Sequence, residues 1–147
     1  MELPEYITIE EVRRVCKELN MRDWTTLKEA KVLSEEARVI LGEINIEGMN
    51  IVLEDFCKGL EVELEHGLRF RDANVTNNHP ILTGKIVLAH LKESLDYYKR
   101  LEVAELEGDL LKALVAKDLA KVKNLYTKRT EAKLILSQAE SDQLASE

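Results

Sequence analysis

The sequence predicts an all-α protein, a bundle of five or six helices. Only two prolines and six glycines occur in 147 residues, so few positions would break a helix. Apolar residues recur three and four positions apart through most of the chain, which is the spacing of one helix face. No alternating apolar and polar run persists, so strands are not expected. The length is that of a single domain, spanning residues 1–147.

Two helices are expected in the N-terminal part of the chain. Thr8 and Glu11 form a capping box, which predicts a helix that runs to about Asn20. A second, shorter helix is expected at about residues 25–31.

The middle of the chain predicts two further helices and one long loop. Ser34 is a typical N-cap for a helix that ends near Gly42. A regular apolar stripe predicts the next helix at about residues 51–66, and Gly67 is its expected stop. Residues 67–79 contain turn-forming residues without helical spacing, so we expect the one substantial loop there.

A central helix is expected at about residues 80–106, with Pro80 at its first position. Its apolar residues fall on two nearly opposite faces, which predicts packing between neighbouring helices. One face comprises Gly84, Leu88, Leu91, Leu95 and Tyr98, and the other comprises Ile86, Ala89, Tyr97, Leu101 and Ala104.

The C-terminal segment, residues 107–147, predicts an amphipathic helix that is interrupted or capped again near Gly108. Its apolar stripe comprises Leu111, Leu114, Val115, Leu119, Val122, Leu125 and Tyr126. Such a stripe needs a surface to pack against. We therefore expect this helix to serve self-association or the binding of a protein partner.

Charge and composition argue against several classes of function. A net charge of −7 is unlike that of a nucleic-acid-binding protein, which needs a basic patch. No stretch reaches the ~20 apolar residues that span a bilayer, and the acidic N-terminus has no apolar signal segment. We therefore expect a cytoplasmic protein without a membrane partner. Cys16 and Cys57 fall on apolar helix faces, where cysteine is usually buried and unreactive.

Three segments carry a family resemblance. Residues 53–67 read LEDFCKGLEVELEHG, residues 74–93 read NVTNNHPILTGKIVLAHLKE, and residues 96–98 read DYY. These words resemble the signature of an uncharacterised family of small helical microbial and phage proteins. Residues 34–42 match its opening helix more weakly.

The resemblance implies no activity, because none is known for the family. It implies a common unit at residues 34–106, extended by a helical segment at residues 1–33 and by the helix at residues 107–147. His79 departs from the family pattern, since an acidic residue usually precedes the proline. Histidine caps a helix less well than aspartate does, so a shared role for this position is not implied.

Two pairs of residues form the candidate site. Glu63 and His66 lie three positions apart at a helix end, and His90 and Glu93 have the same spacing on the central helix. Residues three apart share a helix face. Together with Glu65, these side chains could bind one divalent transition metal such as zinc, manganese or iron.

Two other interpretations stay open. His90 and Glu93 could instead form a structural polar network with Asn74, Thr76 or Asn77, which would hold the loop against the bundle. Metal-free catalysis is the third interpretation, although the sequence contains no P-loop, no G-x-S-x-G elbow and no evident Ser-His-Asp order. The sequence favours a non-enzymatic helical protein that self-associates or binds a partner, and a metal-binding protein or metalloenzyme is the alternative.

Overall fold

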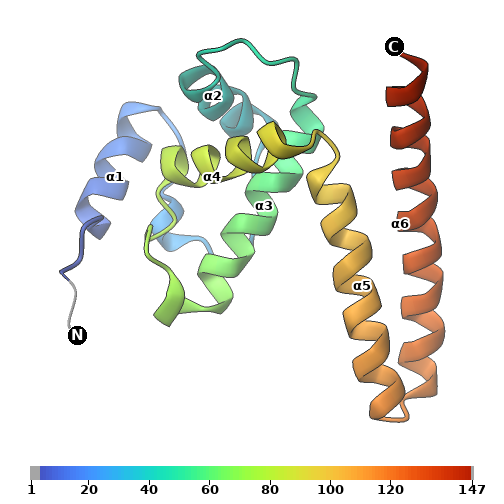
Figure 1. The fold of residues 1–147 in the computed structure, drawn as a ribbon. Coiled ribbons are helices and arrows are strands. Elements are labelled where there is room, and N and C mark those ends of the chain that lie inside the picture. Colours follow the sequence, from blue (N-terminus) through green and yellow to red (C-terminus); the bar gives the residue numbers. More distant parts are fainter. Residues whose placement is uncertain (1–3, 147) are drawn as a thin grey trace. The chain divides into compact units, whose positions relative to one another are not determined.

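The computed structural model describes residues 4–146, and these residues form helices without any strand. The all-α prediction is therefore confirmed. The chain divides into two compact units, the first ending at Glu93 and the second beginning at Ser94 (Figure 1). The first contains α1 (Ile9–Glu18), η1 (Trp24–Thr26), α2 (Ser34–Ile44), α3 (Leu53–Arg69), η2 (Arg71–Ala73) and α4 (Pro80–Glu93). The second contains α5 (Tyr97–Val115) and α6 (Leu119–Ala145).

The first unit is built around α4, which packs against α1, α2 and α3. The predicted cap of α1 is present, since the Thr8 hydroxyl accepts the Glu11 N–H at 3.2 Å. Apolar residues at the helical spacing seen in the sequence form the core. The buried apolar residues of this unit are Val12, Val15, Cys16, Trp24, Val32, Ala37, Ile40, Ile44, Phe56, Leu60, Leu64, Val87 and Leu91.

Gly84 determines how closely α4 approaches α2. A Cβ atom at Gly84 would collide with Cγ2 of Ile40 and would lie 3.1 Å from Cδ1 of Ile44. Both isoleucines are buried, so neither can move towards solvent without opening the core. The absence of a side chain at Gly84 is therefore what lets the two helices pack at this distance.

The second unit is an antiparallel hairpin of α5 and α6 (Figure 1). Val103 and Ala113 of α5 are buried, as are Leu125 and Ala132 of α6. Each pair is spaced to stay on one helix face, which is the pattern of a two-helix seam. No helix among the described residues combines the length and apolar character needed to cross a membrane.

The hairpin turn lies at residues 116–118. Lys117 adopts the left-handed conformation with φ 57°, and the Asp118 N–H donates back to the Ala113 carbonyl at 3.0 Å, which closes the end of α5. The Asp118 carboxylate then accepts the Lys121 N–H at 3.0 Å and caps α6. The segment predicted as one helix at residues 107–147 is therefore the end of α5, this turn and α6.

The predicted helix at residues 80–106 is wrong as a single element, because α4 and α5 are separated by residues 94–96. Asp96 is 2% exposed, and its carboxylate accepts the Ser94 hydroxyl and two guanidinium hydrogen bonds of 2.8 Å from Arg100. A buried carboxylate needs such donors. The Arg100 hydrogen bonds, and those from Ser94, lower the pKa of Asp96 despite the opposing effect of burial.

Three smaller expectations are also wrong. Helix α3 continues past Gly67 to Arg69, and α5 passes through Gly108, because the cost of about 1 kcal/mol for glycine inside a helix does not by itself end one. The helix expected at residues 25–31 is reduced to η1, a single turn. After η1 the backbone bonds to side chains instead, as when the Lys31 carbonyl accepts Arg22 Nη2 at 2.7 Å.

Replacing Gly84 by alanine should lower the free energy of unfolding of the first unit by about 2 kcal/mol, because the added methyl group overpacks the contact with Ile40. Gly42→Ala is the matched control, since its Cβ would meet nothing within 4 Å in α2 and the change should be neutral or slightly stabilising. Urea unfolding followed by circular dichroism measures both. Equal effects of the two variants would contradict a packing role for Gly84.

Candidate functional site

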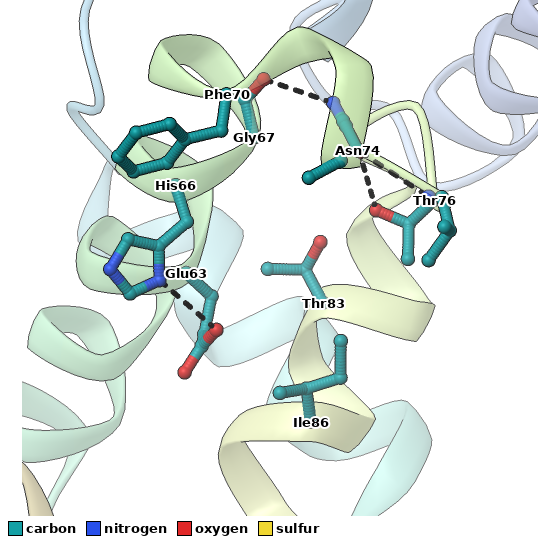
Figure 2. Close-up of a pocket in the computed structure, with 10 residues that line it drawn as sticks. Glu63, His66, Gly67, Phe70, Asn74, Thr76, Thr83 and Ile86 are labelled. Atoms are coloured by element: carbon teal, nitrogen blue, oxygen red, sulfur yellow. Dashed lines mark hydrogen bonds and ion pairs between the residues drawn. The ribbon is translucent and has the colours of Figure 1, made fainter.

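A pocket of about 210 Å³ lies where the end of α3, the following loop and the first turns of α4 meet (Figure 2). Its lining mixes one carboxylate, one imidazole, amide and hydroxyl groups with apolar side chains. The lining residues are Glu63, His66, Gly67, Phe70, Ala73, Asn74, Val75, Thr76, Thr83 and Ile86. The predicted ligand pair Glu63 and His66 is therefore at the pocket. Phe70 and Thr83 were not singled out from the sequence, and Ile86 was predicted only as part of an apolar helix face.

Asn74 holds the loop against the end of α3. Its side-chain amide donates to the Gly67 carbonyl at 3.1 Å and to Oδ1 of Asn78 at 2.9 Å. Its own Oδ1 atom accepts the backbone N–H and the hydroxyl of Thr76 at 3.3 and 3.2 Å (Figure 2). The Asn74 side chain thus forms hydrogen bonds both to α3 and to other residues of the loop.

The loop packs directly against α3 at Gly67. A Cβ atom there would collide with Oδ1 of Asn78 and lie 2.9 Å from Nδ2 of Asn74. Asn78 and its neighbour Asn77 adopt the left-handed conformation, with φ 61° and 48°, which asparagine tolerates better than most residues. The glycine that the sequence suggested as a helix stop therefore acts by allowing close approach of the loop.

Glu63 lies between the two histidines. Its Oε2 atom is 3.8 Å from Nδ1 of His66, and its Oε1 atom is 3.7 Å from Nε2 of His90. These separations exceed a direct hydrogen bond. The Glu63 side chain is 16% exposed, whereas those of His66 and His90 are 49% and 31% exposed. The arrangement brings one carboxylate and two imidazoles from α3 and α4 together, a set that can bind cations or exchange protons.

The other predicted ligands do not join this group. Glu65 and Glu93 are exposed, and Glu65 follows Glu63 by two residues, which places it on the opposite side of α3. Among residues 4–146, no group of three or more His, Cys, Asp or Glu side chains is arranged to hold a metal ion.

The loop residues considered as partners for His90 and Glu93 bond elsewhere. Asn74 and Thr76 bond within the loop and to the end of α3, as described above. The Asn77 amide donates to the Glu5 carboxylate at 2.6 Å and to the Ile7 carbonyl at 2.7 Å. A polar network therefore does hold the loop in place, but it runs to α3 and the N-terminal segment.

His79 caps the first turn of α4. It is buried, and its Nδ1 atom accepts the Leu82 N–H at 3.4 Å. Burial lowers the pKa of His79, and this outweighs the opposing charge of Glu11. A neutral imidazole can accept a hydrogen bond, so the capping geometry is present, although its length indicates a weak contact.

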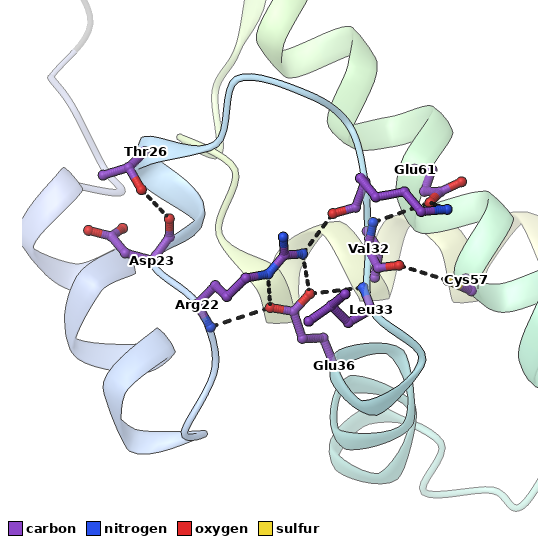
Figure 3. A network of polar contacts seen from close by, with 9 residues as sticks. Arg22, Asp23, Thr26, Val32, Leu33, Glu36, Cys57 and Glu61 are labelled. Atoms are coloured by element: carbon purple, nitrogen blue, oxygen red, sulfur yellow. Dashed lines mark hydrogen bonds and ion pairs between the residues drawn. The ribbon is translucent and has the colours of Figure 1, made fainter.

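A second polar cluster in the first unit is structural. The Glu36 carboxylate, 4% exposed, accepts Arg22 Nε at 2.9 Å and Nη2 at 2.6 Å, and also the Leu33 N–H at 3.1 Å (Figure 3). Burial raises the pKa of Glu36, but the hydrogen bonds and the charge of Arg22 outweigh it and lower the pKa overall. Glu36 therefore stays ionised and joins the segment after α1 to the start of α2.

The two cysteines are free thiols. Cys16 is buried and Cys57 is half-buried. Burial raises the pKa of each thiol above its ordinary value. Because the thiolate is the reactive form, both positions are poorly suited to nucleophilic chemistry.

Asn74→Ala should loosen residues 70–79 and accelerate hydrogen exchange of the Thr76 amide about tenfold or more, because the carboxamide that anchors the loop is lost. Asp72→Ala is the control, since Asp72 is exposed on the same loop. Exchange measured by NMR or mass spectrometry tests this. Unchanged protection at Thr76 would show that Asn74 does not hold the loop.

Comparison with known proteins places most of this structure in one family. Residues 12–107 match the family described as "Protein of unknown function (DUF5661)". The match begins within α1 and ends within α5, so it includes the pocket, both histidines beside Glu63 and much of the predicted N-terminal extension. Neither a curated protein nor a solved structure matches the chain. The chain therefore belongs to the DUF5661 family, whose function is unknown.

Proposed function

We propose that this chain is a non-enzymatic, cytoplasmic helical protein that self-associates through the α5–α6 hairpin. One observation carries the proposal. Large apolar side chains remain more than half exposed beside the hairpin turn, on the last turns of α5 and the first turns of α6. These residues, called the turn patch, are Leu111 at 63%, Leu114 at 52%, Val115 at 77%, Leu119 at 76% and Tyr126 at 55% exposed.

The seam within the hairpin leaves the turn patch uncovered. Leu125 and Ala132 of α6 are buried along the seam, whereas Leu119 and Tyr126 of the same predicted stripe remain exposed. An isolated pair of helices buries only one face of each helix, and helical hairpins commonly pair into four-helix bundles. Clustered exposed apolar residues are typical of protein–protein contact surfaces.

The distribution of charge favours the hairpin over the first unit as the contact surface. Residues 1–93 contain 12 Lys or Arg and 18 Asp or Glu, whereas residues 94–147 contain nine and ten. Two nearly neutral hairpins repel each other less than two acidic units would. A second copy of the chain is therefore the partner that we propose for the turn patch.

Purified protein should be a dimer or larger assembly at tens of micromolar, and the double substitution Leu114→Gln with Leu119→Gln should shift it to monomer, because it removes apolar contact area. Thr127→Gln is the matched control, since Thr127 is exposed on α6 outside the turn patch. Size-exclusion chromatography with light scattering gives the mass. A wild-type monomer throughout this concentration range would refute the proposal.

Binding of a divalent transition metal such as zinc, manganese or iron is the second candidate function. The position of Glu63 between His66 and His90 supports it. Because the three donors do not converge, binding would require the half-exposed His66 ring to turn towards Glu63. The predicted ligands Glu65 and Glu93 could at most complete the shell after a larger movement.

Elemental analysis of untagged protein purified without chelator tests this candidate. Metal binding predicts close to one equivalent of a transition metal, lost in His90→Ala and retained in Glu65→Gln, since Glu65 is exposed on the other side of α3. Less than about a tenth of an equivalent of every transition metal, also after incubation with zinc, would eliminate it.

A further inference from the structure

We infer that two copies of the chain pair with their hairpins antiparallel, so that the turn end of each lies against the open end of the other. This inference rests on the proposed self-association and adds the geometry of the complex. The ion pair between Glu107 and Arg129, 2.9 Å long, joins α5 to α6 and divides the hairpin. We call residues 108–128 the turn half, and residues 94–107 with 129–146 the open half.

The two halves carry opposite charge. The turn half contains five lysines and two aspartates, a net charge of +3. The open half contains four Lys or Arg and seven Asp or Glu, a net charge of −3. The lysines are Lys112, Lys117, Lys121, Lys123 and Lys128, all of them exposed. The hairpin is therefore a strongly polarised rod, although its total charge is close to zero.

The opposite charges of the two halves favour one of two alignments, parallel or antiparallel, for a pair of hairpins. A parallel pair places +3 beside +3 and −3 beside −3, whereas an antiparallel pair places each turn half beside an open half. Like charges in an interface are unfavourable, and complementary charges set the orientation of a complex. Only the antiparallel pair is self-complementary in charge, and its twofold symmetry repeats the same contact twice.

The open half also offers apolar surface to the turn patch. Leu134, Ile135 and Leu144 of α6 are 72%, 55% and 77% exposed. Helix α6 has 27 residues, which corresponds to about 40 Å. Leu119 of the turn patch begins α6 and Leu144 lies one residue before its end, whereas Leu134 and Ile135 lie just beyond its midpoint. Antiparallel pairing brings each turn patch to the partner's open-half residues, so both apolar surfaces are covered together.

Zero-length carbodiimide cross-linking of the full chain distinguishes the orientations. Lys121 and Asp142 are both exposed on α6 but lie 21 residues apart, about 30 Å along the helix, so a direct link between them must join two copies. Equimolar ¹⁴N and ¹⁵N protein, mixed and analysed by mass spectrometry, identifies links between copies. We expect links between turn-half lysines and open-half carboxylates such as Asp142. Links confined to turn-half lysines and the turn-half Asp109 or Asp118 of the other copy would overturn the antiparallel arrangement.

Charge reversal provides a second readout. Lys121→Glu with Lys128→Glu changes the turn half from +3 to −1, and Glu105→Lys with Asp142→Lys changes the open half from −3 to +1. Each double variant should weaken dimerisation about tenfold or more, and the quadruple variant should recover most of the wild-type affinity. All four positions are exposed, and circular dichroism verifies that each variant folds.

The outcomes separate the two proposals. A wild-type monomer at all concentrations refutes self-association itself. A wild-type dimer whose affinity is unchanged in both double variants, or not restored in the quadruple variant, retains self-association but refutes the antiparallel pairing. Recovery in the quadruple variant, together with the Lys121–Asp142 link, supports it.

Discussion

The first unit depends on the close packing of α4 against α2 at Gly84. Because Ile40 and Ile44 occupy the space where a side chain would lie, α4 can pack here only with a glycine. This contact fixes the position of α4, which also packs against α1 and α3. Thr83 and Ile86, next to Gly84 on the same helix, then face the end of α3 and close one side of the pocket. The close approach of α4 at Gly84 thus places one wall of the pocket.

The second wall of the pocket is the loop at residues 70–79, which has little regular structure and is held in place by side-chain hydrogen bonds. Two asparagine side chains of the loop donate to backbone carbonyls outside it, Asn74 to Gly67 of α3 and Asn77 to Ile7 before α1. The loop is consequently held at both sides, by α3 and by the N-terminal segment. Glu63 and His66 therefore face a preformed wall, which distinguishes this part of α3 from an ordinary helix end.

The helices of the hairpin have fewer packing neighbours than the central helix of the first unit. The first unit surrounds its central helix with neighbours, whereas α5 and α6 have one seam and a near-equal number of opposite charges. Exposed apolar residues near the turn and the open end remain available for contact. The family match ends at residue 107, so the turn patch lies beyond the matched region. The family match therefore covers most of the first unit and the first part of α5, whereas the rest of the hairpin lies outside it.

Local patterns in the sequence determined the helical class, the cap at Thr8 and the buried stripe of Phe56, Leu60 and Leu64, because spacing and capping act within a few residues. The tertiary structure decided where helices end and which polar groups meet. The break before α5 accompanies the burial of Asp96, and Gly67 serves the loop rather than a helix stop. The placement of Glu63 between His66 and His90 also arises from packing, since residues 27 positions apart approach only when α3 and α4 are in contact.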